Sequence, residues 1–130
     1  MLDMPTIAIV DDDEAVRVAT ASLVRSLGYA ARPYASAEDF LADLARDPVA
    51  APPDCLITDV QMPGITGLQL QDQLQAEGRT FPIIITTAFH SEVLRQRAVA
   101  SGAAAFLEKP FNGDVISEVL ESVLARIGRS

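Results

Sequence analysis

The sequence predicts a single α/β domain built on a doubly wound, five-stranded parallel sheet. Five short apolar runs, each too short for a helix, lie along the chain. An amphipathic stretch follows each run, and this strict alternation implies parallel strands joined by right-handed crossovers, with helices on both faces of the sheet. A length of 130 residues with 49% apolar side chains suits one core and leaves no room for a second ordinary domain. We therefore expect one domain over residues 1–130, with its core at about 6–127.

The first predicted strand has the pattern of a buried strand, and the second has the pattern of an edge strand. Thr6–Val10 is β-branched, lacks polar alternation and stops at three aspartates, which is typical of a fully buried strand. Glu14–Leu27 carries apolar residues at helical spacing, and Gly28 supplies a helix terminator. The second strand, Tyr29–Ala35, contains Pro33, which cannot donate a ladder hydrogen bond. This strand should therefore lie at an edge.

The second helix and the third strand follow. Ser36, with Asp39 three residues later, resembles an acidic capping box and predicts a helix over Ala37–Arg46. Asp54–Thr58 is the third predicted strand, and it leads directly into Asp59.

The remaining elements repeat the alternation. Pro82–Ala88 is the most hydrophobic predicted strand and should be central, while Ala103–Glu108 leads into Lys109. The last three predicted helices span Gly67–Glu77, the segment from Ser91 to Ser101, and Asp114–Ile127.

Composition narrows the classes of function. A net charge of -8 argues against direct nucleic-acid binding, which depends on clustered Lys and Arg. The single cysteine, Cys55, cannot form an internal disulfide and is expected to be a buried free thiol. No apolar run approaches the roughly 20 residues of a membrane span, and the N-terminus lacks the basic region of a signal peptide. We therefore expect a cytoplasmic protein that does not bind membranes.

Polar residues gather where the predicted strands end. Asp11, Asp12, Asp59, Thr87 and Lys109 all follow or close a strand, and function in open α/β sheets lies at the carboxyl ends of the strands. Converging carboxylates repel one another and favour a bound cation. Oxygen ligands without His or Cys favour Mg2+, for which Mn2+ could substitute.

The same set of residues suits phosphoryl transfer. A carboxylate such as Asp59 can attack phosphorus and form an acyl phosphate. Lys109 and a threonine hydroxyl are suited to phosphoryl oxygens, and a metal ion with Lys109 would offset the charge that develops on them.

Four segments, in this order and spacing, resemble the receiver domain of two-component response regulators: IVDDDEAVR, TDVQMPGITGL, IIITTA and FLEKPF. The resemblance extends from about Thr6 to Ile127. It implies a bacterial signalling protein with a flavodoxin-like (βα)5 fold and the strand order 2-1-3-4-5.

The resemblance assigns roles to the acidic residues. Asp59 matches the phosphoacceptor. Asp12 matches a direct Mg2+ ligand and Asp11 a ligand through water, while Gln61 would contribute its backbone carbonyl.

The resemblance also assigns the groups that assist and transmit the reaction. Thr87 matches the switch hydroxyl, and Lys109 matches the family lysine, whose bond to the following proline is often cis. Phe106 matches the switch aromatic, where many relatives carry Tyr; the replacement keeps the family's rotation and removes a hydroxyl. Phe89 and Gln61 would tune the lifetime of the phosphoryl group.

Partners and output follow from the family as well. The resemblance implies a sensor histidine kinase as donor and a signalling switch that only catalyses its own phosphorylation and dephosphorylation. The signal would change the surface of the fourth helix, fifth strand and fifth helix. The sequence leaves open whether the output is transcription through a C-terminal DNA-binding domain or a separate partner protein, and whether phosphorylation produces a homodimer.

Simpler interpretations exist for some residues. Asp13 is expected to be a solvated carboxylate at a helix start, outside the site. Phe106 could be ordinary core packing, since aromatic residues on strands usually are. His90, the only histidine, is interpreted as a loop residue.

Three other functions are compatible with parts of the pattern. An aspartyl-phosphate phosphatase or phosphotransferase usually has an acid two residues after its nucleophile, where this chain has Gln61. A degenerate receiver would lack site residues that are present here. A flavin binder of the flavodoxin type would need a phosphate-binding loop where Asp11 to Asp13 would repel the ligand.

Overall fold

A computed structural model of the chain describes residues 4–46, 51–89 and 91–128. Within these residues, five strands and five helices alternate along the chain, as predicted. The strands are β1 (Thr6–Val10), β2 (Ala30–Tyr34), β3 (Cys55–Asp59), β4 (Ile83–Thr87) and β5 (Ala105–Glu108). The helices are α1 (Glu14–Ser26), α2 (Ala37–Arg46), α3 (Gly67–Ala76), α4 (Glu92–Ala100) and α5 (Gly113–Arg126).

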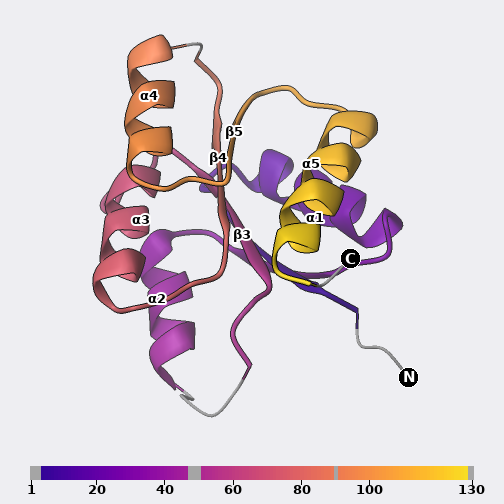
Figure 1. Cartoon of the computed structure of the whole chain (residues 1–130), viewed down its shortest axis with the longest axis horizontal. Coiled ribbons are helices and arrows are strands. Elements are labelled where there is room, and N and C mark those ends of the chain that lie inside the picture. Colours follow the sequence, from indigo (N-terminus) through magenta and orange to yellow (C-terminus); the bar gives the residue numbers. More distant parts are fainter. Residues whose placement is uncertain (1–3, 47–50, 90, 129–130) are drawn as a thin grey trace.

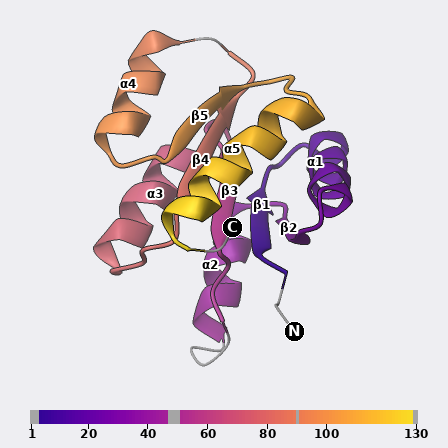
Figure 2. The same cartoon turned by 45° about the vertical axis from the view of Figure 1, so that its right-hand side comes forward.

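The strands form one parallel sheet in the order β2-β1-β3-β4-β5, so the predicted class and strand order are confirmed (Figures 1 and 2). Pro33 lies in β2 at an edge, where its missing N–H leaves no gap in an interior ladder. The middle strand of the sheet is β3, and the fourth strand is its interior neighbour. β4 is buried along its whole length between β3 and β5.

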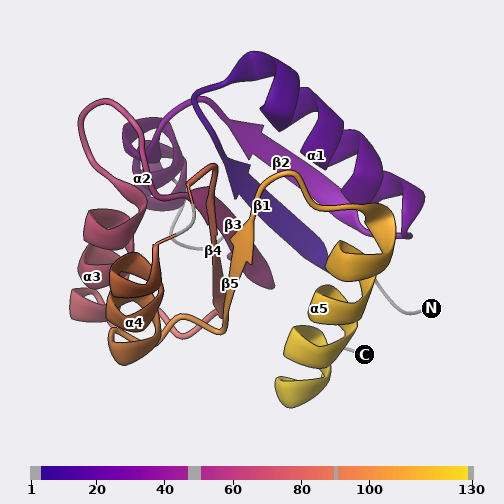
Figure 3. The ribbon, with the colours of Figure 1, turned by 90° about the horizontal axis from the view of Figure 1, so that it is seen from above.

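The sheet separates two hydrophobic cores. Helices α2, α3 and α4 cover one face, and α1 and α5 cover the other (Figure 3). The split follows the period of two along a strand: in β1, Ala8 and Val10 face the first core, while Ile7 and Ile9 face the second. Cys55 lies in the second core, which confirms the expected buried free thiol, and burial raises the pKa of this thiol to about 12.

Glycines end four of the helices, α1, α3, α4 and α5. Gly28, Gly78, Gly102 and Gly128 have φ angles of 95°, 78°, 99° and 76°, the left-handed conformation that stops a helix. After Gly102, the Ala103 N–H donates to the carbonyl of Ala98 at 2.9 Å. β5 therefore starts at Ala105, later than predicted, because Ala103 completes the end of α4. No helix in the described part of the chain is long and apolar enough to cross a membrane.

The start of α3 lies directly against the end of β3. The Gly67 N–H donates to the Val60 carbonyl at 3.0 Å, and a Cβ at Gly67 would overlap the backbone carbonyl of Asp59. A residue without a side chain is therefore needed at this crossing. Thr66 caps the helix in a capping box with Gln69, and this Thr-x-x-Gln pattern is a local signal for the start of α3.

Candidate functional site

The predicted site residues lie where the carboxyl ends of the parallel strands form one edge of the sheet. β4 and β5 end at the top of Figure 1, and the register places Asp59 opposite Thr86, and Thr87 opposite Glu108. The Lys109 N–H also donates to the Thr87 carbonyl at 2.7 Å. The parallel ladder thus brings residues from distant parts of the sequence to neighbouring positions.

Three carboxylates form a cluster at this edge. One oxygen each of Asp11, Asp12 and Asp59 lies within 4.8 Å of the others. Asp11 and Asp59 are buried, with exposures of 4% and 8%, whereas Asp12 is exposed. This all-oxygen donor set, open to solvent at Asp12, fits a hard divalent cation such as Mg2+ or Mn2+.

Lys109 bridges the two buried carboxylates. Its Nζ lies 2.7 Å from Asp11 Oδ2 and 3.4 Å from Asp59 Oδ2, and its side chain is only 14% exposed. The peptide bond between Lys109 and Pro110 is cis, which the sequence could not show. The ammonium group offsets part of the repulsion between the carboxylates.

The ionised form of Asp59 remains electrostatically unfavourable even with Lys109 beside it. Its pKa is raised above 3.8, first because burial penalises the charged form and then because of repulsion from Asp11. Lys109 and a hydrogen bond from the Gln61 backbone oppose the shift without cancelling it. A further cation at the cluster would favour the ionised form.

The loop between β1 and α1 is fixed by several hydrogen bonds. The Asp13 N–H donates to Asp11 Oδ1 at 2.9 Å, and Asp13 Oδ1 accepts from the Val16 N–H at 3.2 Å. Asp13 is therefore the helix cap expected outside the cluster. Arg17 Nη1 donates to the Asp11 carbonyl at 2.9 Å, a contact that was not predicted although Arg17 ends the segment IVDDDEAVR.

The two threonines at the end of β4 have different surroundings. Thr86 Oγ1 donates to the Thr58 carbonyl at 3.4 Å and belongs to the sheet interior. Thr87 Oγ1 accepts from the Phe89 N–H at 3.1 Å and lies 3.3 Å from the Phe89 carbonyl. The Thr87 hydroxyl is thus bonded to the following loop, and its switch role stays a prediction.

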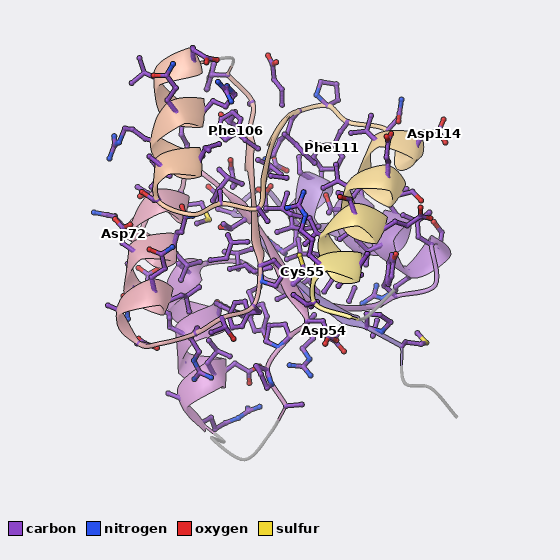
Figure 4. The ribbon with its side chains drawn as sticks, viewed as in Figure 1. Asp54, Cys55, Asp72, Phe106, Phe111 and Asp114 are labelled. Carbon is purple, nitrogen blue, oxygen red and sulfur yellow. The ribbon has the colours of Figure 1, made fainter. Side chains whose placement is uncertain are left out.

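Phe106 lies half-buried against the core on the α4 side of the sheet, as Figure 4 shows. This packing agrees with both interpretations of Phe106, so its switch role stays a prediction. Gln61 is exposed, and its proposed carbonyl contact to a metal also stays a prediction. The interpretation of His90 as a loop residue lies outside the described residues.

An apolar cavity of about 310 Å³ borders Lys109 on the α1 side. Ala15, Ala19 and Leu23 line it from α1, and Pro110 and Phe111 line it from the loop before α5. Figure 4 shows Phe111 beside the first turn of α5. A largely apolar surface therefore lies directly next to the charged cluster.

Comparison with known proteins identifies relatives for almost the whole chain. The family model described as response regulator receiver domain matches residues 7–121. The transcriptional regulatory protein FixJ of Azorhizobium caulinodans is 40% identical over 124 residues, which are 94% of this chain and 54% of FixJ. The C4-dicarboxylate transport transcriptional regulatory protein DctR of Rhodobacter capsulatus is 39% identical over 127 residues, 95% of this chain and 62% of DctR. The chain thus spans between half and two thirds of the length of these curated relatives.

Solved structures show the same fold. The crystal structure of FixJ-N has a TM-score of 0.84 at 34% identity, covering 96% of each chain. A response regulator receiver protein from Burkholderia phymatum has a TM-score of 0.83 at 41% identity, covering 93% of this chain and 95% of that one.

Replacing Asp59 with Asn should raise the free energy of unfolding of the metal-free protein at neutral pH. Because the native pKa lies above 3.8, the native state holds this proton more tightly than the unfolded chain does. Stability is therefore lost as the pH rises from 3.8 through the native pKa, and an amide removes that loss.

Urea unfolding in EDTA, from acidic to neutral pH, measures this difference. The matched control is Asp72→Asn, which changes an exposed carboxylate on the outer side of α3 (Figure 4). A D59N variant that is less stable than the wild type at neutral pH, or a stability difference that does not grow with pH, would contradict a raised pKa of Asp59 in the folded protein.

Proposed function

The chain belongs to the response regulator receiver domain family of two-component signalling, and we propose that Asp59 is the residue on which it carries a phosphoryl group. The observation that supports this most strongly is the placement of the Asp59 carboxylate. It closes the middle strand, 3.4 Å from the Lys109 ammonium and within the cluster with Asp11 and Asp12.

In the proposed reaction, a carboxylate oxygen of Asp59 attacks the phosphorus of a phosphohistidine. A P–O bond forms, the P–N bond breaks, and the electron pair stays on the departing imidazole nitrogen. Hydrolysis later returns the carboxylate and releases phosphate. Lys109 moves from its position between Asp11 and Asp59 to a phosphoryl oxygen, where its fixed charge offsets the charge that develops in the transition state.

Asp11, Asp12 and Asp59 would hold Mg2+, with Mn2+ as a substitute, and the Gln61 carbonyl would complete the protein ligands. When bound, the ion supplies positive charge that neutralises the phosphoryl oxygens and favours the ionised nucleophile. Asp12 would be the direct ligand and Asp11 would act through water, because the Asp11 carboxylate is already bonded to Lys109 and the Asp13 N–H.

The proposed switch starts at Thr87. To donate a hydrogen bond to a phosphoryl oxygen, the Thr87 hydroxyl must leave the Phe89 carbonyl, 3.3 Å away, and so release the loop that leads to α4. Phe106, half-buried against the same core, would rotate in response and change the surface of α4, β5 and α5. Phe89 and Gln61, both exposed beside the site, would tune the lifetime of the phosphoryl group.

The proposed partners are a sensor histidine kinase as donor and, downstream, an output domain or protein that reads the α4–β5–α5 surface. Control of transcription is the proposed output, because FixJ and DctR are both transcriptional regulatory proteins. A phosphorylation-dependent homodimer would use the exposed apolar residues of the same surface, such as Val93 and Val99. We also propose a cytoplasmic location and no catalysis beyond the turnover of the protein's own aspartyl phosphate.

The donor must bring its phosphohistidine to Asp59, and the apolar cavity beside Lys109 is the proposed docking surface. Small side chains at Ala15 and Ala19 leave room for side chains of a partner, and Pro110 and Phe111 add apolar area next to the reaction site. Burial of this surface would supply binding energy without a contact to the reacting atoms.

Replacing Asp59 with Asn should abolish labelling by acetyl phosphate and Mg2+, because the amide lacks a nucleophilic carboxylate. The matched control is Asp13→Asn, which keeps a helix-capping side chain and lies outside the cluster. Phosphate incorporation and peptide mapping measure the effect. Labelling of D59N at the wild-type rate would rule out Asp59 as the acceptor.

Replacing Ala19 with Arg should slow phosphoryl transfer from a kinase that labels the wild type, on the order of 10-fold or more, because a charged side chain would occupy the docking cavity. Labelling by acetyl phosphate should stay unchanged. Val18→Arg is the control, because Val18 is exposed on the same helix and does not line the cavity. Equal kinase rates for the two variants would exclude this docking surface.

A further inference from the structure

Arg17 makes a contact at the acidic site to which no role has been assigned. Its Nη1 donates to the backbone carbonyl of Asp11 at 2.9 Å, and its backbone N–H donates to the Asp13 carbonyl at 2.8 Å. Arg17 lies near the start of α1 and is half-buried. One residue therefore bonds to both ends of the three-residue loop that carries Asp11 and Asp12.

The Asp11 carbonyl lies where β1 leaves the sheet. The paired register of β1 ends at Val10, and the Asp11 N–H makes one further bond to the Tyr34 carbonyl at 3.2 Å. The Asp11 carbonyl therefore lies beyond the ladder, in a residue that is 4% exposed. Buried carbonyls need a donor, and the guanidinium supplies a charged one.

This carbonyl belongs to the peptide group that joins Asp11 to Asp12. Its direction helps to set the orientation of the Asp12 backbone, from which the exposed carboxylate of the cluster projects. The other end of the loop is fixed by Asp13, which caps α1 and donates to Asp11 Oδ1. Arg17 thus restrains the part of the loop that the cap does not.

We propose that Arg17 is a positioning residue for the divalent cation, holding the Asp11–Asp12 peptide so that the Asp12 carboxylate faces Asp11 and Asp59 before the ion arrives. This inference rests on the proposed metal-dependent function. Arg17 acts through Asp11 and Asp12, as the outer partners of metal ligands do in other proteins.

Because Arg17 is charged, the inference can be tested by whether Mg2+ binds more tightly or more weakly when Arg17 is replaced. A cation near the site repels a divalent ion, so an arginine that acted only through charge would weaken Mg2+ binding, and its removal would tighten binding. An arginine that positions the ligands strengthens Mg2+ binding, and its removal would weaken binding. The direction of the change in affinity therefore separates the two effects.

The experiment compares Arg17→Gln with Arg25→Gln in the whole chain. Arg25 lies in the last turn of α1, where its Nη2 lies 3.5 Å from the Ala31 carbonyl, so R25Q removes the same charge from the far end of the same helix. Mg2+ dissociation constants are measured from NMR amide shifts at constant ionic strength. R17Q should raise the dissociation constant on the order of 10-fold, and R25Q should leave it within about two-fold.

Two further measurements exclude a merely structural effect. Labelling by acetyl phosphate at saturating Mg2+ should return to the wild-type rate in R17Q, because Arg17 does not contact the reacting atoms. Arg17→Lys keeps the charge and a donor but not the planar fork, and should have an intermediate affinity. R17K carries the test if R17Q does not fold.

The outcomes distinguish this inference from the proposed function. If the wild type binds Mg2+ and R17Q binds it equally well or more tightly, the role of Arg17 is wrong and the metal site stands. If R17Q stays slow at saturating Mg2+, Arg17 acts on the reaction itself and the positioning role is also wrong. If the wild type does not bind Mg2+, both the metal site and the role of Arg17 are wrong.

Discussion

The arrangement of the acidic site depends on the ammonium group of Lys109, which lies between the buried carboxylates of Asp11 and Asp59. Asp11 and Asp59 are buried close together, and Lys109 lies 2.7 Å and 3.4 Å from their carboxylates. This ion pairing is incomplete, because burial and Asp11 still raise the pKa of Asp59. The fold therefore maintains a cluster of carboxylate oxygens whose negative charge is only partly offset. The parallel sheet, the close approach of Gly67 to Asp59 and the loop before α1 all hold this cluster in place.

Much of this arrangement could be predicted from local sequence signals. Buried strands that end on Asp11, Asp59 and Lys109 place these residues at one edge, because parallel strands end on the same side of a sheet. The start of β5 could not be predicted, because Ala103 looks like strand sequence and yet completes the end of α4. The Arg17 contact and the packing of Phe106 depend on side-chain conformations that only the assembled fold determines.

Helix α4, which follows Thr87 in the chain, buries little of its surface against the domain. In α4 only Ala98 is fully buried, and near its end α3 provides Gln71, whose Nε2 lies 3.2 Å from the Ser101 carbonyl. Gln75 bonds to the same carbonyl. The end of α4 nearer Thr87 is joined to the loop that the Thr87 hydroxyl contacts. Thr87 therefore lies near the end of α4 that lacks the contacts of Gln71 and Gln75.

We propose that Asp59 accepts the phosphoryl group within a metal site that it forms with Asp11 and Asp12. A crystal structure grown with Mg2+ and beryllofluoride, a stable mimic of the phosphoryl group, tests it most directly. We expect beryllium bonded to an Asp59 carboxylate oxygen, Mg2+ bound by Asp12 and Asp59, and Lys109 bonded to a fluoride. Beryllofluoride at another residue, or an ion held without Asp12 and Asp59, would contradict it.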